Sequence, residues 1–222
     1  MLVKNFFDFF AKIHHSRISD YCRNLEFENF IDVGSHEGEF IQEFLKNKKI
    51  KKFYCFEPQA KIFRKLKKKL KKNKKIKFFN IALGDKVTKK KLFLSNLSPA
   101  STLSKFDSTS LYYKIKNFII SNNNKNKYFT ISQETIDKVF RKIDLNKTFL
   151  KIDVEGYEYN VLKGSKNKIK EIPYIIVENH LFNQYENNFD KVKNFLTKNN
   201  YKVLKVFRSP TLHYSDILFK KN

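Results

Sequence analysis

The sequence predicts an α/β protein with a mostly parallel sheet and helices on both of its faces. From residue 29 onward, short apolar runs of strand length alternate with longer stretches whose apolar residues follow helical spacing. Strands joined through helices are connected by right-handed crossovers, which make neighbouring strands parallel. Several apolar runs end in glycine, proline or acidic residues. We therefore expect one domain over residues 29–222, preceded by a helical extension over residues 1–28.

The first half of this domain contains three expected strands and two expected helices. The run NFIDVG (29–34) is apolar up to a tight turn, and Pro58 stops the second strand, KKFYCFEP (51–58). Apolar residues four apart run through the lysine-rich helix expected over 60–73, so we interpret its basic face as solvated. A nucleic-acid-binding patch is the alternative for that face. A helix over 38–47 and a strand over 75–85 complete this half.

The second half of the domain begins with a break in the alternation. Residues 96–127 are polar and irregular apart from one short apolar piece, and a loop of this length is usually functional or mobile. We expect this loop, together with the N-terminal helix, to recognise the substrate. The alternation of strands and helices then returns. Strands are expected over 128–132, 149–156, 173–180, 201–207 and 216–221. One helix is expected to begin near residue 132, and two more are expected over 159–170 and 188–200.

The N-terminal stretch MLVKNFFDFFAKIHH has apolar residues at helical spacing and is expected to form a short amphipathic helix. Lys4 and Asp8 interrupt the apolar run and no small-residue cleavage site follows, which argues against a targeting segment. We expect the helix to pack on the domain or over its ligand, and attachment to a membrane surface is the alternative. No run approaches the ~18 consecutive apolar residues that a membrane span needs.

The net charge of +24 is the most unusual feature of the composition. Lysine supplies 41 of the 46 basic residues, whereas recognition of nucleic acid usually relies on arginine. The other abundant residues share A/T-rich codons with lysine, so genomic base composition explains much of the charge. No specific nucleic-acid partner is therefore expected. Peripheral contact with an anionic membrane or a lipid-linked glycan stays open.

The two cysteines, Cys22 and Cys55, indicate neither a zinc site nor a disulfide framework, because they form no CxxC pair and lack further partners. Free thiols of this kind fit a cytoplasmic location.

The stretch DVGSHEG (32–38) follows the first strand. Gly34 and Gly38 would let the backbone approach a ligand closely, but their G-x-x-x-G spacing differs from the dinucleotide fingerprint G-x-G-x-x-G. Asp32, Glu37 and Glu39 concentrate negative charge here, which would repel a pyrophosphate and suits a cationic ligand. The N–H groups at the start of the next helix would be free for a small carboxylate.

Glu57 stands at the end of the second strand. An acid in this position typically accepts hydrogen bonds from the ribose hydroxyls of a bound nucleoside. Combined with a glycine-rich turn that lacks the pyrophosphate fingerprint, it points to S-adenosylmethionine, which carries a ribose, an amino-acid end and a sulfonium charge. Pairing of Glu57 with a surface lysine is the alternative.

A third acidic motif, KIDVEGYE (151–158), ends the strand 149–156. Asp153, Glu155 and Glu158 surround Gly156, and capping of the helix that begins near Tyr157 accounts for only one or two of these acids. Asp153, at the carboxyl end of the strand, is the stronger functional candidate.

In chain order, the motifs FIDVGSHEG, FYCFEP, FFNIALGD, SPASTLS, TISQETID, FLKIDVEGYEYNVLKG, IIVENH and DILF resemble the FkbM family of methyltransferases over roughly residues 28–220. IDVEGYEYNVLKG is the most characteristic of them. The resemblance implies a Rossmann-like class I methyltransferase with a seven-stranded sheet and S-adenosylmethionine as cofactor. It also implies O-methylation of a hydroxyl on a carbohydrate, a surface glycan or a related metabolite.

The resemblance also implies roles for individual residues, carried over by position. It implies that Asp32, Gly34, Ser35 and Gly38 surround the amino-acid end of the cofactor and that Glu57 binds the ribose. It also implies that Asn80, Ala82 and Asp85 lie beside the adenine and that Asp153 faces the sulfonium and the acceptor. Two departures stand out: a TLDD-like segment reads TISQETID here, and Ser35-His36 replaces the usual Ala or Asn after DVG.

Methyl transfer to a hydroxyl benefits from a base that takes the hydroxyl proton. Glu155, Glu178 and His180 are the candidates, and we favour His180 because its ordinary pKa of ~6.5 suits a base near neutrality. A divalent metal held by Asp153, Glu178 and His180 is the less favoured alternative, and no metal ligand is assigned.

Two other function classes stay open. A nucleic-acid methyltransferase fits the basic charge, but the N-P-P-Y or D-P-P-Y motif of base-modifying enzymes is missing from the strand that carries IDVEG. A non-catalytic cofactor-binding module would keep the fold without the reaction, although the acids at all three strand ends count against it.

Overall fold

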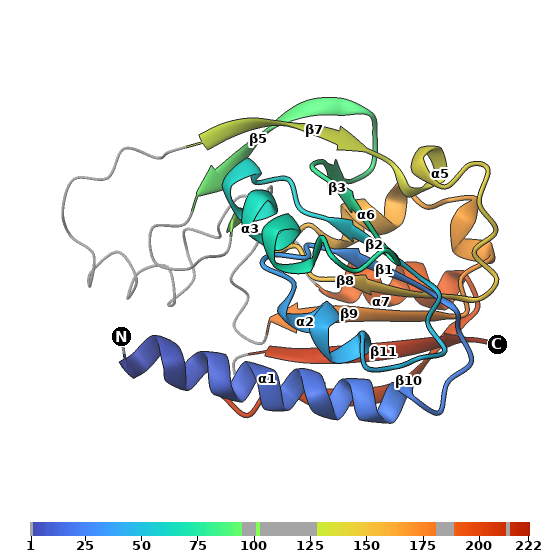
Figure 1. The fold of residues 1–222 in the computed structure, drawn as a ribbon. Helices are drawn as coiled ribbons and strands as arrows, with labels where there is room; N and C mark the ends of the chain where they lie inside the picture. Colours follow the sequence, from blue (N-terminus) through green and yellow to red (C-terminus); the bar gives the residue numbers. More distant parts are fainter. Residues whose placement is uncertain (1, 95–100, 103–127, 181–188, 212–213) are drawn as a thin grey trace.

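A seven-stranded sheet forms the centre of the protein (Figure 1). The computed structural model describes residues 2–94, 101–102, 128–180, 189–211 and 214–222. The strands of the sheet are β1 (Asn29–Val33), β2 (Lys52–Phe56), β3 (Ile76–Phe79), β8 (Thr148–Ile152), β9 (Tyr174–His180), β10 (Tyr201–Arg208) and β11 (Tyr214–Lys221). Their order across the sheet is β10-β11-β9-β8-β1-β2-β3.

The sheet is mostly parallel. Pairs β1–β2, β2–β3, β1–β8 and β8–β9 are parallel, whereas β11 runs antiparallel to both of its neighbours. From β1 the chain moves to β2 and β3 on one side, and β8 and β9 then extend the sheet on the other. The strand order therefore reverses beside β1, where ligands of open α/β sheets bind.

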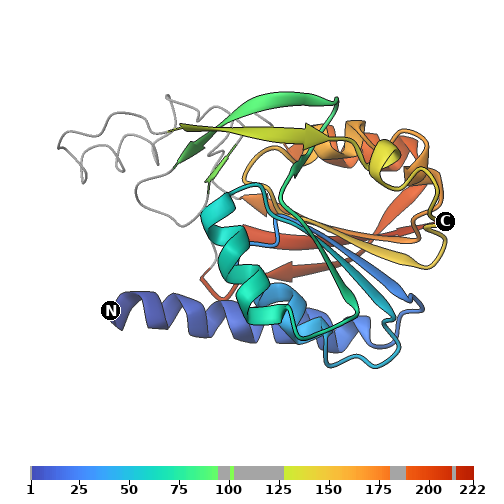
Figure 2. The same cartoon turned by 45° about the horizontal axis from the view of Figure 1, so that its top comes forward.

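In the part of the chain that the structure describes, three helices cover each face of the sheet (Figure 2). The helices of one face are α1 (Leu2–Cys22), α2 (Glu39–Phe44) and α3 (Ala60–Leu70), and those of the other are α5 (Ile136–Val139), α6 (Glu158–Lys163) and α7 (Phe189–Lys198). Successive strand residues point to opposite faces, so Phe30 packs beneath α2 while Ile31 belongs to the core on the α6 side. This arrangement confirms the predicted fold class.

Aromatic side chains dominate the core beneath α1 and α2. The ring of Phe30 stacks on Phe149 of the adjacent strand at 5.3 Å and contacts Phe44 of α2 at 4.6 Å. All three side chains are fully buried or nearly so. Burial of each such ring stabilises the fold by about 2–3 kcal/mol, which fixes α2 against β1 and β8.

A second, four-stranded sheet was not predicted from the sequence. It consists of β4 (Ala82–Leu83), β5 (Thr88–Leu94), β6 (Ser101–Thr102) and β7 (Tyr128–Glu134), in the order β4-β7-β5-β6. The expected strand 75–85 is therefore divided between two sheets. The division falls at Asn80, whose side-chain amide donates to the carbonyl oxygens of Glu57 and Pro58 and so turns the chain away from β2. Most of the expected loop 96–127 lies outside the described residues.

The helix expected over 159–170 is also shorter than predicted. It ends at Lys163, and a single 3-10 turn follows at Lys168–Lys170. A Cβ atom on Gly164 would lie 1.9 Å from the carbonyl oxygen of Gly84. The end of α6 thus presses on the backbone that follows β4, where only glycine fits.

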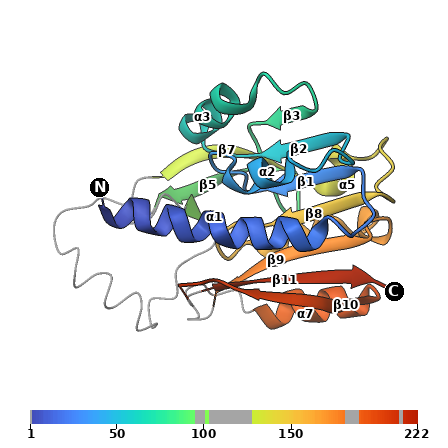
Figure 3. The same cartoon turned by 60° about the horizontal axis from the view of Figure 1, so that its bottom comes forward.

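Helix α1 is longer than the short helix expected and lies over the α2 face of the sheet (Figure 3). Its buried residues Ile18 and Cys22 join the core, while Phe9 and Ile13 are exposed. His14 is completely buried, and its Nε2 atom lies 2.8 Å from Oδ2 of Asp216 on β11. Among the helices described, none combines the length and the apolar character needed to cross a bilayer.

We expect His14→Ala to lower the free energy of unfolding by about 3 kcal/mol, because it leaves the Asp216 carboxylate buried without its partner. Arg17→Ala, an exposed change on the same helix, should alter it by less than about 0.5 kcal/mol. Urea unfolding of both variants, followed by circular dichroism, checks this. Equal stability of the two would show that the ion pair does not anchor α1.

Candidate active site

The three acidic motifs meet at one edge of the sheet because they follow the carboxyl ends of neighbouring parallel strands. The turn after β1 is tied to both flanking strands by backbone hydrogen bonds. Gly34 and Ser35 donate to the carbonyl oxygen of Phe56, and Asp153 donates to the carbonyl oxygen of Val33. The site is therefore built on rigid sheet backbone rather than on independent loops.

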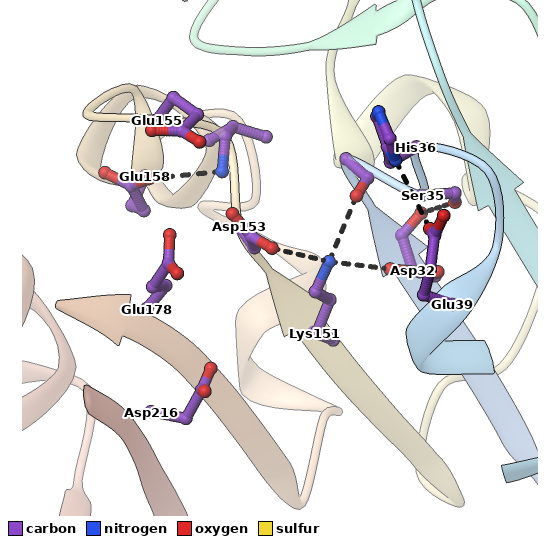
Figure 4. Close-up of polar contacts among 12 residues, drawn as sticks. Asp32, Ser35, His36, Glu39, Lys151, Asp153, Glu155, Glu158, Glu178 and Asp216 are labelled. Carbon is purple, nitrogen blue, oxygen red and sulfur yellow. Dashed lines mark hydrogen bonds and ion pairs between the residues drawn. The ribbon is translucent and has the colours of Figure 1, made fainter. Parts of the chain in front are cut away.

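Lys151 links the first and third motifs (Figure 4). Its ammonium group lies 3.1 Å from a carboxylate oxygen of Asp32, 3.1 Å from one of Asp153 and 3.0 Å from the carbonyl oxygen of Gly34. Burial raises the pKa of Asp32, with Lys151 acting in the opposite direction. Burial also raises the pKa of Asp153, but Lys151 outweighs it and leaves that pKa below its ordinary value. Asp153 is therefore a stable carboxylate at neutral pH.

Glu57 is 4% exposed and holds the turns around it. Its Oε1 atom accepts the backbone N–H of Gln59 at 2.8 Å, and its Oε2 atom accepts that of His36 at 3.1 Å. Burial raises its pKa, and these amides partly offset the effect. Among the described residues, the hydrogen-bond donors to the Glu57 carboxylate are these two backbone amides rather than a surface lysine.

The segment after β8 is a tight turn stabilised by Glu158. Its Oε1 atom accepts the backbone N–H groups of Val154 at 3.2 Å and Gly156 at 3.0 Å, so Glu158 holds the turn rather than only capping α6. Glu155 and Gly156 both adopt left-handed backbone conformations, with φ of +54° and +87°. Burial raises the pKa of Glu158 to about 7.

Glu155, Glu178 and His180 form a compact group beside this turn. Nε2 of His180 lies 2.9 Å from Oε2 of Glu178 and 3.4 Å from Oε2 of Glu155. Burial lowers the pKa of His180, but the carboxylates around it, Glu178 foremost, raise it to about 10. The imidazole is therefore protonated at neutral pH, so its predicted role as general base is not supported by its surroundings.

A cavity of about 770 Å³ opens at this edge of the sheet. Its volume lies in the range of small-molecule and cofactor sites. Among its lining residues are Ala11, Lys12 and His15 of α1; Val33, Gly34, His36, Glu37 and Glu39; Phe56, Glu57, Pro58 and Gln59; Ile81, Ala82, Leu83 and Leu92; and Asp153, Val154, Glu155 and Tyr157.

The predicted site residues divide into those that line this cavity and those that do not. The lining ones are Gly34, Glu57, Ala82, Asp153 and Glu155, together with Glu37 and Glu39. The others lie behind the wall or away from it: Asp32, Ser35, Gly38, Asn80, Asp85, Glu178 and His180.

The residues behind the wall support the ones in front. Asp32 is fully buried against Lys151, and the hydroxyl of Ser35 donates to the carbonyl oxygen of Asp32 at 2.8 Å. Asp85 contacts the hydroxyl of Tyr157 and lies 3.5 Å from Lys163. Direct contact of any of these three with a cofactor remains a prediction.

Contacts within the protein and left-handed backbone conformations account for both glycines of the first motif, with a backbone clash at Gly34 and movable leucine side chains at Gly38. A Cβ atom on Gly34 would lie 1.8 Å from the carbonyl oxygen of Asp153, and one on Gly38 would lie 2.8 Å from side-chain carbons of Leu66 and Leu70. Both glycines also have left-handed backbone conformations. Close approach of a ligand, the reason expected from the sequence, is not needed to explain either of them.

Sequence reasoning missed two contributors to the site. Lys151 was visible as a single charged residue in the otherwise apolar run FLKI, and a buried lysine requires a carboxylate partner. His15 had no such signal. It lies against the ring of Phe40 at 4.9 Å, and burial lowers its pKa to about 4, so it is a neutral imidazole in the cavity wall.

Comparison with known families and structures agrees with this architecture. The sequence profile of the Methyltransferase FkbM domain matches residues 32–203. A search of curated proteins finds none that matches.

Three solved structures illustrate the shared fold. The FkbM methyltransferase of Methylobacillus flagellatus KT superimposes with a TM-score of 0.57 at 16% identity, covering 87% of this chain and 43% of that one. TrmK of M. capricolum, in complex with S-adenosyl-homocysteine, gives 0.51 at 14% identity, covering 92% and 67%. The tRNA methyltransferase TrmK of B. subtilis gives 0.52 at 11%, covering 94% and 65%. At these identities the similarity establishes the fold, and the chain spans less than half the length of the Methylobacillus protein.

We expect Glu158→Gln to remove a pH dependence of stability. The pKa of Glu158 is about 7 in the folded state and 4.5 ordinarily. Between these two pH values the unfolded chain has lost the Glu158 proton, whereas the folded protein still holds it. The wild-type free energy of unfolding should therefore fall by about 3 kcal/mol between pH 4.5 and 7 from this group alone. The glutamine keeps an acceptor for the two amides and should lack this fall. Urea unfolding at pH 5 and pH 7.5 measures the difference.

The exposed Glu26→Gln variant is the control for this experiment, and it should keep the wild-type dependence. If Glu158→Gln kept it as well, Glu158 would be ionised in the folded protein throughout this pH range.

Proposed function

Because the chain belongs to the FkbM family of methyltransferases, whose profile matches more than half of it, we propose that it transfers a methyl group from S-adenosylmethionine to an acceptor hydroxyl. The observation that carries this proposal is the cavity at the strand-order reversal, with a buried carboxylate on one wall and an acidic rim opposite. The acceptor class that fits best is a carbohydrate, a surface glycan or a related metabolite.

The residues present fit the cofactor. The wall near β2 combines the Glu57 carboxylate with the apolar side chains of Phe56 and Ile81, as a ribose beside a purine ring requires. Each oxygen of Glu57 accepts one backbone N–H and keeps a lone pair for a ribose hydroxyl. Asp153 and Glu155 supply negative charge on the opposite wall, which suits a sulfonium.

When bound, S-adenosylmethionine supplies the methyl group, which passes to the acceptor oxygen while the sulfur keeps the electron pair of the broken bond. The protein aligns the two reactants and excludes water, which is the main source of acceleration for such a displacement. Asp153 and Glu155 are the acids of the third motif that reach the cavity, and one of them takes the hydroxyl proton. Glu178 supports the wall from behind.

Helix α1 supports the expectation that the N-terminal segment contacts the acceptor, because Ala11, Lys12 and His15 line the cavity. The neutral imidazole of His15 can donate and accept hydrogen bonds, as a polyhydroxylated acceptor demands. The thiols of Cys22 and Cys55 are free and buried. Because free thiols are typical of a reducing compartment, we propose a cytoplasmic location for the reaction.

A nucleic-acid acceptor is the second candidate. Lys65 and Lys69 of the basic helix α3 line the cavity, and two of the structures with the same fold are TrmK proteins. Methylation of extracted RNA but not of glycans would favour this candidate. Incubation of the purified chain with labelled S-adenosylmethionine and each extract, followed by mass analysis of the product, decides between them.

We expect Glu57→Ala to weaken binding of S-adenosylmethionine by roughly 10–100-fold, because hydrogen bonds to a charged group are worth about 1.5–3 kcal/mol. Glu57→Gln, which keeps one acceptor oxygen, should lie between this variant and the wild type. Isothermal titration calorimetry with S-adenosylmethionine and S-adenosyl-homocysteine measures the effect.

Glu26→Gln serves as the exposed control, and circular dichroism confirms that the variants are folded. Unchanged affinity in folded Glu57→Ala would remove Glu57 from the ribose site. If the wild-type protein bound neither compound, a non-catalytic module would explain the chain better than a methyltransferase.

A further inference from the structure

Three potential metal ligands come together at the edge of the cavity. Glu155 lies in the turn after β8, and Glu178 and His180 lie at the end of the adjacent strand β9. One donor atom from each of the three side chains lies within 4.8 Å of the others. The two strands are paired in parallel, so the sheet itself fixes this convergence.

The spacing of these donor atoms matches that around a small cation. Donors bound at about 2.1 Å and separated by 90–109° lie about 3.0–3.4 Å apart. The two distances from Nε2 of His180, 2.9 Å to Glu178 and 3.4 Å to Glu155, fall at these values. Little movement of the side chains would be needed to admit an ion between them.

The surroundings of the group are rich in negative charge. Asp153, Glu155, Glu158 and Glu178 gather at the ends of β8 and β9 (Figure 4). The side chains of Glu158 and Glu178 are largely buried, and those of Glu155 and Asp153 are 23% and 34% exposed. Lys151 balances Asp153 on this side, because its other ion pair is with Asp32 on β1, and His180 is the one other basic side chain paired with these four acids in the described residues, so carboxylates outnumber basic groups. A divalent cation would offset this surplus in a place where water screens it poorly.

We infer that Glu155, Glu178 and His180 bind a divalent first-row transition-metal ion with open coordination positions toward the cavity. One imidazole and two carboxylates suit Mn²⁺, Fe²⁺ or Zn²⁺ better than Ca²⁺, which prefers all-oxygen sites. Glu155 lines the cavity and so brings the ion to its wall. This inference rests on the proposed function and deepens it: the ion would hold the acceptor oxygen, and Asp153 would remain outside the ligand set to take the hydroxyl proton.

Titration of the whole 222-residue chain, stripped of metal, with Mn²⁺ tests the site when it is followed by electron paramagnetic resonance. The signal of free Mn²⁺ should fall until one ion is bound per chain. Glu178→Gln and His180→Ala should each weaken binding by roughly tenfold or more, since each removes a ligand. Glu155→Gln should do the same with less risk to folding, because Glu155 is the most exposed of the three side chains.

His36→Asn is the matched control. His36 also lies near a glutamate, with Nδ1 3.3 Å from Oε2 of Glu39, but has no third donor in the described residues, and asparagine tolerates its left-handed backbone. Mn²⁺ binding should be unchanged in this variant. If His36→Asn lost the ion and folded Glu155→Gln kept it, the site would be wrongly placed.

Binding of S-adenosyl-homocysteine, measured on the same samples, separates this inference from the proposed function. If that ligand binds but the wild type takes up no stoichiometric Mn²⁺ or Zn²⁺ at millimolar concentration, the metal site is overturned and the methyltransferase proposal stands. His180 would then act only as a cation between two carboxylates. If the metal binds but the cofactor product does not, the proposed function fails instead.

Discussion

The buried ammonium group of Lys151 is the interaction on which the site depends. It contacts Asp32 at the end of β1, Asp153 just beyond β8 and the carbonyl oxygen of Gly34 between them. Two carboxylates this close and this shielded would repel each other strongly without a cation between them. Removal of one partner from a buried ion pair costs about 3–5 kcal/mol, so Lys151 fixes the relative position of the first and third acidic motifs. The steric fit of Gly34 against Asp153 reinforces the same contact.

The interior of the site and the surface of the protein have opposite charge. The chain carries a formal net charge of +24, yet the cavity wall contains Glu57, Asp153 and Glu155, with Glu158 and Glu178 close behind. Surface lysines are screened by solvent and salt over about 10 Å, whereas the shielded carboxylates act on a ligand at short range. The overall charge therefore says little about the ligand of the cavity, and the local acids favour a cationic one.

The sequence was sufficient for the fold class and for the position of the three motifs, because alternation of strands and helices places Glu57 and Asp153 at the same edge of a parallel sheet. It was insufficient where contacts between distant segments decide the structure. The division of the expected strand 75–85 depends on the bonds that Asn80 makes to the chain after β2. The charge of His180 likewise depends on carboxylates brought to it from two separate strand ends. No spacing within the sequence could show that two carboxylates lie against the imidazole of the favoured base.

The N-terminal helix shows how much of a site can lie outside the segment that identifies a family. The FkbM profile begins at residue 32, but α1 supplies Lys12 and His15 to the cavity wall. Its position is set by His14, which binds Asp216 on β11, the residue paired with Glu178 on β9. Within one turn of α1, His14 therefore contacts the sheet and His15 lines the cavity. Because the sheet side of the helix is anchored separately, substitutions facing the cavity can change what it contacts without disturbing the acidic motifs on the strands.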